Sequence, residues 1–162
     1  MRCSLCHSEK SLRACDECKS KVCKNCAVFP DKDLCDFHPD PPKVLQHAHL
    51  CFQCHETEYV PLMAHYDEIF EKSKDVTVVS RAFRGLVPTL KKKHELVQVK
   101  LHLDEKIAVA HLKFLAAWNG WDAVVGMETV AKQVRRHGYE HSKWSAQGYF
   151  ANLNKRRFRP DG

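Results

Sequence analysis

The sequence predicts an α+β protein in two parts, a cysteine-rich N-terminal module and a small domain with the order β-β-α-β-β. Three observations predict this division. All nine cysteines of the 162-residue chain lie before residue 55. Ten basic and twelve acidic residues precede residue 75, whereas sixteen basic and eight acidic residues follow from there. Hydrophobic periodicities typical of strands and of one helix occupy the second part. We expect a cysteine-rich domain at 1–58, a connecting helix at 59–74, a basic α+β domain at 75–154 and a basic tail at 155–162.

The clustered cysteines indicate metal binding and not a disulfide scaffold. Disulfide-rich proteins are short secreted chains whose cysteines are spread through the fold, whereas the residues after Cys54 contain no thiol. An odd number of cysteines leaves one unpaired, and the N-terminus "MRCSLCHSEK" has no apolar segment of the kind that directs export. No apolar run reaches the roughly 20 residues that span a bilayer. We expect a cytosolic or nuclear protein, in which clustered thiols are usually metal ligands.

The spacing of the cysteines indicates which metal they bind. Two intervening residues allow a tight turn to direct both side chains at one ion, and structural zinc takes four such ligands in a tetrahedron. Five steps of this length follow one another: Cys3 and Cys6, Cys15 and Cys18, Cys23 and Cys26, Cys35 and His38, and Cys51 and Cys54. The sequence therefore predicts two or three zinc ions per chain.

Zinc is also needed for the stability of this part of the chain. The first 54 residues contain few large apolar side chains, which is too little core for independent folding. Structural zinc contributes on the order of 10 kcal/mol of folding free energy per site. We expect the cysteine-rich module to be unfolded when its metal is removed.

The first six cysteines are separated by gaps of two, eight, two, four and two residues. This pattern resembles the cross-brace (treble-clef) zinc modules of the FYVE, PHD, RING and B-box families, in which ligand pairs one and three bind one ion. The resemblance implies a first site formed by Cys3, Cys6, Cys23 and Cys26. It implies a second site that contains Cys15 and Cys18 together with either Cys51 and Cys54, as in FYVE modules, or Cys35 and His38, as in B-boxes.

We favour the FYVE-like pairing, because FYVE modules end in a Cys-x2-Cys that leads into a helix. The residues after Cys54, "HETEYVPLMAHYDEIFEKS", can form that helix despite Pro61. The stretch after Cys26 contains four prolines and cannot form a long helix. The FYVE-like pairing leaves a possible third site composed of Cys35, His38, His47 and His49. In the B-box pairing, the last two cysteines instead form the third site with neighbouring histidines.

The second part begins with two predicted strands and a predicted helix. "DVTVVSRAF" (75–83) is rich in β-branched residues, and "ELVQVKLHL" (95–103) alternates apolar and polar residues. Asp104 is a predicted N-cap, and the apolar residues after it repeat at helical spacing until Asn119-Gly120, a stop signal. We expect this helix to lie on an antiparallel sheet.

Two more predicted strands follow, "WDAVVGMETVAKQV" (121–134) and "SKWSAQGYFANL" (142–153), joined by a turn at "RRHGYE". Gly126 within the first of them predicts a bulge or close packing. The helix, the "GWDAVVGM" after it and the later "WSAQGYFANL" are similar to the YbjQ-like family of small α+β proteins. This resemblance implies a homo-oligomer. The metal-binding property attributed to that family is not expected here, because the histidines of this part share no ligand spacing.

Basic residues gather in three clusters of the second part. Clustered cations attract nucleic acid or anionic lipid by counterion release, although solvated loops have the same composition. The clusters consist of Lys91, Lys92 and Lys93, of Arg135 and Arg136, and of Lys155, Arg156, Arg157 and Arg159. Tyr149, Phe150 and Phe158 are candidates for stacking on exposed bases. We expect the tail to be disordered without a partner, because its charges repel one another.

No catalytic constellation is visible in the sequence. Complete zinc sites leave no open position for a substrate, and there is no phosphate-binding glycine loop or G-x-S-x-G motif. We expect a non-catalytic zinc-stabilised adaptor, whose zinc module docks a protein partner and whose basic domain mediates oligomerisation or polyanion contact. A nucleic-acid-binding zinc protein is the alternative. A RING-like ubiquitin ligase or an adaptor at an anionic membrane surface is a further one.

Overall fold

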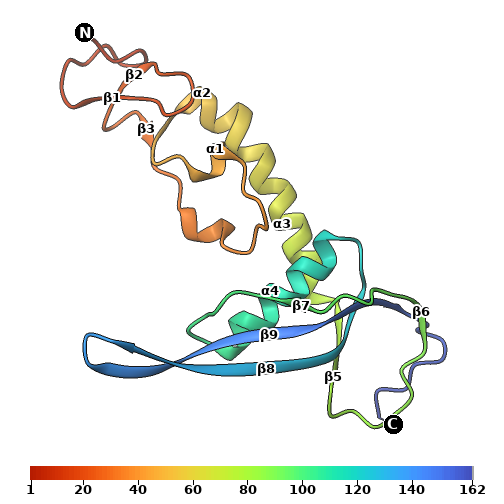
Figure 1. Ribbon diagram of the computed structural model, residues 1–162. Coiled ribbons are helices and arrows are strands. Elements are labelled where there is room, and N and C mark those ends of the chain that lie inside the picture. Colours follow the sequence, from red (N-terminus) through yellow and green to blue (C-terminus); the bar gives the residue numbers. More distant parts are fainter. Residues whose placement is uncertain (162) are drawn as a thin grey trace. The chain divides into compact units, whose positions relative to one another are not determined.

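The structure, a computed structural model, describes residues 1–161 and divides into two compact units, Met1–Glu68 and Ile69–Gly162. The first unit contains two small antiparallel sheets (Figure 1). Strand β1 (Leu12–Ala14) pairs with β2 (Lys21–Cys23), and β3 (Ala27–Val28) pairs with β4 (Leu50–Cys51). The proline-rich stretch between β3 and β4 contains only a 3-10 turn, η1 (Lys32–Cys35), and the four-residue helix α1 (Lys43–Gln46).

A helical run begins directly after β4 and confirms that Pro61 does not prevent a helix there. It consists of α2 (Phe52–Cys54), a π-helical segment η2 (His55–Tyr59) and α3 (Val60–Lys74). The N–H of Val60 donates to the carbonyl of His55, which is the five-residue step of a π-helix. In a regular α-helix the ring of Pro61 would clash with the carbonyl four residues earlier. The wider turn lies at that point and relieves this conflict. The boundary between the two units falls within α3.

The second unit is built on a five-stranded sheet with strand order β5-β8-β9-β6, and β7 also pairs with β9. Its strands are β5 (Thr77–Ser80), β6 (Thr89–Lys92), β7 (Val97–Gln98), β8 (Ala123–Arg136) and β9 (Tyr139–Leu153). Three expectations were wrong. The order β-β-α-β-β lacks β6, which lies between the two strands predicted before the helix. The sheet is mixed, because β5 pairs with β8 in parallel. The predicted strand 95–103 is reduced to β7 and one isolated bridge, from His102 to Trp144.

Helix α4 (Glu105–Trp118) has the predicted start and stop. The Asp104 side chain accepts from the N–H of Lys106 at 2.7 Å, which caps the first turn. At the other end, Gly120 has φ +80, and the N–H of Trp121 donates to the carbonyl of Ala116. A glycine in this left-handed conformation satisfies the last carbonyls and ends the helix.

The two faces of the sheet carry separate apolar clusters. On one face, Val124, Ala146 and Phe150 pack against α4 through Ala108, Leu112 and Ala116. On the other face, the loop after β5 and the C-terminal tail cover the apolar side chains. There, Phe83, Val87 and Phe158 pack against Val79, Ala123, Val125, Ala151 and Leu153. The unit is therefore folded around apolar cores and contains no cysteine.

Strands β8 and β9 form a hairpin that is longer than the rest of the sheet (Figure 1). Its two-residue turn is His137-Gly138, with φ of +51 and +82, which suits the right-handed twist of a hairpin. The pairing register shifts between Val125 and Glu128, and Gly126 has φ +61. The predicted bulge at Gly126 is confirmed. Among residues 1–161, no helix combines the length and apolar character that crossing a membrane requires.

Candidate metal centres and basic surfaces

The first unit brings eight cysteines together in two groups of four. Within each group the sulfur atoms all lie within 4.8 Å of one another. One group, site one, is Cys3, Cys6, Cys23 and Cys26; the other, site two, is Cys15, Cys18, Cys51 and Cys54. The ligand pairs alternate along the chain, so the two sites are interleaved. This is the arrangement of the FYVE-like pairing, and the B-box pairing of Cys35 and His38 with the second pair does not form.

The distances between sulfurs fit a tetrahedral zinc ion and not a disulfide. Sγ of Cys6 lies 3.5 Å from Sγ of Cys23, and Sγ of Cys18 lies 3.7 Å from Sγ of Cys51. Four zinc–sulfur bonds of about 2.3 Å in a tetrahedron place the sulfurs about 3.8 Å apart. A disulfide bond is only about 2.0 Å long. The two groups therefore have the dimensions of four-sulfur zinc sites.

Tight turns position the cysteines of both sites. The N–H of His7 donates to the carbonyl of Cys3, and the N–H of Lys19 donates to the carbonyl of Cys15. His7 and Lys19 have positive φ, 58 and 63, although neither is glycine. A residue in this conformation after the second cysteine turns the chain away, so that both sulfurs face the same point. These two residues support the sites, and the sequence gives no direct signal of their role.

The end of site two is formed by the start of the helical run. Cys51 is the N-cap of α2, and its sulfur accepts from the N–H of Cys54 at 3.4 Å. The N–H of Cys51 in turn donates to the sulfur of Cys15 at 3.2 Å. Backbone N–H groups and the positive end of a helix favour thiolates over thiols. The N-terminus of the helical run, which begins at Phe52, is therefore an electrostatic part of the site.

The thiols within each site have opposite pKa shifts. Hydrogen bonding to the backbone N–H of Cys6 lowers the pKa of Cys3 to about 6, and hydrogen bonding with the Ser20 side chain lowers that of Cys18 to about 6. Hydrogen bonding with the sulfur of Cys6 raises the pKa of Cys26 to about 12, and burial raises the pKa of Cys54. Four neighbouring sulfurs cannot all ionise unless a cation offsets their charge. A divalent ion replaces these protons, so its affinity falls as the pH is lowered.

The possible third zinc site does not form among residues 1–161. Sγ of Cys35 is buried and donates to Sδ of Met63 on α3 at 3.0 Å, and burial raises the pKa of this thiol. His38 stacks on Tyr66, with ring centroids 6.5 Å apart. Cys35 and His38 therefore pack against α3 and are not gathered with the other proposed ligands.

His47 and His49 contact carboxylates beside site two. Nε2 of His47 lies 2.8 Å from Oε2 of Glu17, and Nδ1 of His49 lies 3.5 Å from Oδ2 of Asp16. The backbone N–H groups of Ala48 and His49 also donate to the Asp16 carboxylate. These contacts connect the chain before β4 to the turn of Cys15 and Cys18, which is a structural role.

We expect two zinc ions per chain in purified protein. The observation is that the described residues form two complete four-sulfur sites and no third group of ligands. Elemental analysis against the protein concentration measures this ratio. A ratio of three would require ligands outside these sites, and iron in place of zinc would contradict the identity of the metal.

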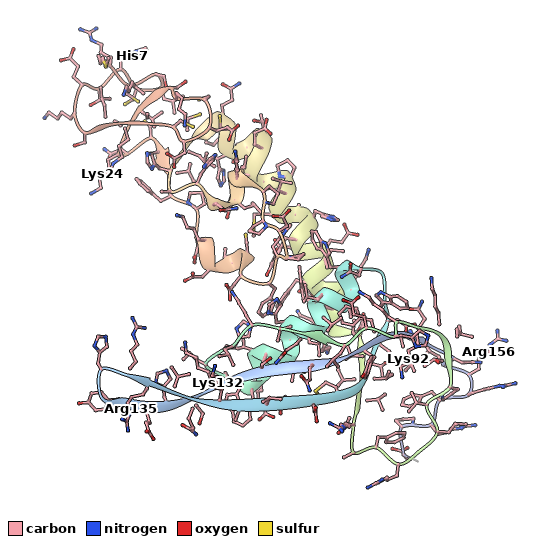
Figure 2. The ribbon with its side chains drawn as sticks, in the orientation of Figure 1. His7, Lys24, Lys92, Lys132, Arg135 and Arg156 are labelled. Atoms are coloured by element: carbon pink, nitrogen blue, oxygen red, sulfur yellow. The ribbon has the colours of Figure 1, made fainter. Side chains whose placement is uncertain are left out.

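The second unit carries two separate basic surfaces. Because Thr89 pairs with Leu153 and Lys92 with Ala151, β6 lies beside the residues that follow β9. We define the β6–tail surface as Lys91, Lys92, Lys93, Lys155, Arg156, Arg157 and Arg159, all of which are exposed or half-buried. Arg135 and Arg136 lie at the other end of the sheet, near the hairpin turn. Figure 2 shows Lys132 and Arg135 on the hairpin, and Lys92 and Arg156 at the opposite end.

Two of the aromatic residues predicted to stack on bases are not available for it. Phe150 is 2% exposed and belongs to the core under α4. Phe158 packs on the other face of the sheet, with its ring centroid 6.1 Å from that of Phe83. The tail expected to be disordered is thus attached through Phe158, and the N–H groups of Arg157 and Phe158 donate to the carbonyl of Asn154. Tyr139 at the hairpin turn is instead 79% exposed.

No protein-family model, curated protein or solved structure matches the chain. The FYVE, PHD, RING, B-box and YbjQ-like resemblances therefore rest on the sequence motifs alone. The two four-cysteine groups fit zinc-binding modules on the geometry described above.

A groove of about 910 Å³ lies in the second unit between α4 and the edge formed by β5 and β8. Nη1 of Arg81 contacts both carboxylate oxygens of Glu128, at 3.0 and 2.9 Å, and Arg81 lowers the pKa of Glu128. The Gln147 amide donates to the same carboxylate, and the hydroxyl of Thr129 donates to Glu105 at 2.6 Å. Each of these five side chains therefore has a hydrogen-bond partner among the others.

Proposed function

We propose that the protein is a non-catalytic, zinc-stabilised binding protein whose sheet unit contacts nucleic acid. The first unit would be a cross-brace module similar to FYVE-type domains, with zinc in both sites serving stability. The observation that carries the proposal is the β6–tail surface, in which pairing between β6 and β9 joins two basic clusters that are about sixty residues apart in the sequence. Adjacent cations attract the phosphates of a polyanion more strongly than isolated ones.

The lysines of β6 are held on aromatic rings. Nζ of Lys91 lies 5.6 Å from the ring centroid of Trp121, and Nζ of Lys92 lies 4.9 Å from that of Tyr149. A ring attracts the cation without neutralising its charge. Because Lys91 pairs with Asn152 and Lys92 with Ala151, the two side chains lie on opposite faces of this edge strand, each beside a ring.

We expect the variant K155Q/R156Q/R157Q/R159Q to bind duplex DNA more weakly, and with a smaller dependence on salt. The slope of log K against log salt would fall by up to about 0.9 for each phosphate that the protein no longer neutralises. Stability would change little, because Phe158 is retained. Fluorescence anisotropy of a labelled duplex, titrated at several salt concentrations, measures the slope.

The matched control for this variant removes four cations from the first unit. Lys10, Lys24, Lys32 and Lys43 are all exposed, so their change to glutamine lowers the net charge equally without touching the sheet. An equal loss of affinity in both variants would show that only net charge matters. An unchanged slope in the tail variant would remove the β6–tail surface from the proposal.

Docking of a protein partner by the zinc unit is a second candidate. Large apolar side chains are exposed there, including Phe29 at 51%, Leu34 at 56% and Phe52 at 58%. Exposed apolar side chains indicate an interaction site when they form a contiguous patch, so this candidate requires that the three act together. The double variant F29S/F52S would keep both zinc ions and lose crosslinked partners in cells. If the set of crosslinked proteins does not change, this candidate fails.

A further inference from the structure

We propose that the free part of the β8–β9 hairpin, residues 132–143, enters the major groove of duplex DNA. We call this segment the arm. The inference rests on the proposed contact with nucleic acid and names duplex DNA as the ligand. The arm is separate from the β6–tail surface. Experiments can therefore contradict the proposal for the arm without contradicting the proposal for the β6–tail surface, and the reverse.

Within the part of the chain that the structure describes, the arm pairs with no third strand. Pairing of β5 with β8 ends at Met127, and β7 pairs with β9 only at Gln147 and Gly148. One bridge from His102 reaches as far as Trp144. Beyond that residue the two strands are held only by each other, over the five pairs that end at Arg136 and Tyr139. At about 3.4 Å per residue the arm extends roughly 20 Å beyond the sheet, and Figure 1 shows this projection.

The two faces of the arm differ, because residues paired across the strands share a face. On the face continuous with the α4 side, the polar groups bind one another. Arg135 lies opposite Glu140 and contacts its carboxylate at 2.9 Å, and Gln133 donates to Ser142 at 3.0 Å. The charge of Arg135 on this face is therefore balanced by Glu140 within the protein.

The opposite face carries cations and no acidic residue. It consists of Lys132, Val134 and Arg136 on β8, opposite Lys143, His141 and Tyr139 on β9. Within residues 1–161, neither lysine nor Arg136 forms an ion pair. Lys132 and Lys143 are directly opposite each other, which destabilises the pairing of the strands unless an anion lies between them. We call this the cationic face.

The dimensions of the arm select the groove. Two strands about 4.8 Å apart, with their side chains, fit the major groove of B-form DNA, which is about 12 Å wide and admits a two-stranded ribbon. The minor groove is only about 6 Å wide. The major groove of an RNA duplex is deep and narrow, and side chains do not enter it. A duplex of B-form DNA is therefore the polyanion that matches the arm.

The tip of the arm adds an apolar contact to the charges. Tyr139 is 79% exposed beside the turn, on the cationic face. Such a ring can contact base edges and sugars when the tip enters the groove, while Lys132 and Lys143 contact phosphates along its sides. Arg136 is placed next to Tyr139, where its guanidinium can donate to the N7 and O6 atoms of guanine.

The test compares the full zinc-loaded protein with K132Q/R136Q/K143Q, using a labelled 20-base-pair duplex as the probe. We expect a loss of affinity of about tenfold or more, with the salt slope smaller by up to about 1.8 because Lys132 and Lys143 each neutralise one phosphate. The matched control K10Q/K24Q/K32Q removes the same charge from the first unit and should bind as the parent does. The melting temperature of the arm variant should not fall, because the change removes the repulsion between Lys132 and Lys143.

Protection of guanine N7 from dimethyl sulfate shows whether the groove itself is occupied, since N7 lies in the major groove. The parent protein should protect it, and the arm variant should not. Equal affinity and equal protection by the parent and the arm variant would contradict the proposed role of the arm. Binding to single-stranded RNA without binding to the duplex would also contradict it. In either case the proposed function stands if the tail variant still weakens binding. If the parent binds no nucleic acid near physiological salt, both proposals fail.

Discussion

Removal of both zinc ions by a chelator is expected to unfold residues 1–68 and to leave the sheet unit folded. Besides cysteines, the buried apolar side chains before residue 60 are only Val22, Leu45, Leu50 and Tyr59. This is too small a core to offset the loss of conformational entropy on folding. Each structural ion contributes on the order of 10 kcal/mol, which is comparable to the whole stability of a typical domain.

A two-dimensional NMR spectrum of the full chain separates the two units in this experiment. Amide signals of the first unit should collapse to the narrow range of an unfolded chain, and those of the sheet unit should keep their dispersion. Addition of zinc, but not of magnesium, should restore the spectrum, because thiolates bind soft metals. Retained dispersion in the first unit after complete chelation would show that its fold does not depend on metal.

The variant C51S is expected to be as damaging as C15S, whereas C35S should keep both ions. Cys51 and Cys15 belong to the same site, and the sulfur of Cys51 also caps α2. Loss of either thiolate leaves three ligands and removes much of the folding free energy that zinc provides. Cys35 lies against Met63 outside both sites, so serine there costs only a buried polar group, about 1–3 kcal/mol.

Native mass spectrometry measures the zinc content of the three variants, and thermal unfolding measures their stability. The expected order places C35S close to the parent in zinc content, and the other two below it in both quantities. If C35S lost an ion while C51S kept two, site two would be completed by Cys35 and His38 and not by Cys51 and Cys54.

The cysteine spacing was sufficient to predict that these thiols gather in groups that could hold a metal ion, because a Cys-x2-Cys turn is a local structure that few other residues determine. The choice between Cys51 and Cys35 required the resemblance and the prolines after Cys26, since spacing alone allows both. The third site was predicted from sequence proximity. The structure uses Cys35 and His38 for packing on α3, and His47 and His49 for contacts with Glu17 and Asp16, which no spacing rule describes.

In the second unit, local signals were reliable and long-range ones were not. The N-cap at Asp104, the glycine stop and the hairpin turn each depend on a few neighbouring residues. Whether β5 runs parallel or antiparallel to β8 is determined by the connection through α4. The β-branched residues that predict a strand do not indicate its direction. Strand β6 was missed because its residues, Thr89–Lys92, are all exposed and show no apolar alternation. The segment 95–103 does alternate, yet Leu103 is 72% exposed.

The interleaving of the two sites also determines an order of events during synthesis. The chain leaves the ribosome N-terminus first, so site one has all its sulfurs when Cys26 has emerged, and site two waits for Cys54. The sulfur contact between Cys6 and Cys23 in site one spans 17 residues of chain, and the contact between Cys18 and Cys51 in site two spans 33. Closing the longer loop costs more entropy, but Cys15 and Cys18 lie between the ligands of site one. An ion captured first by site one would therefore bring Cys15 and Cys18 into a fixed loop before the rest of site two has emerged.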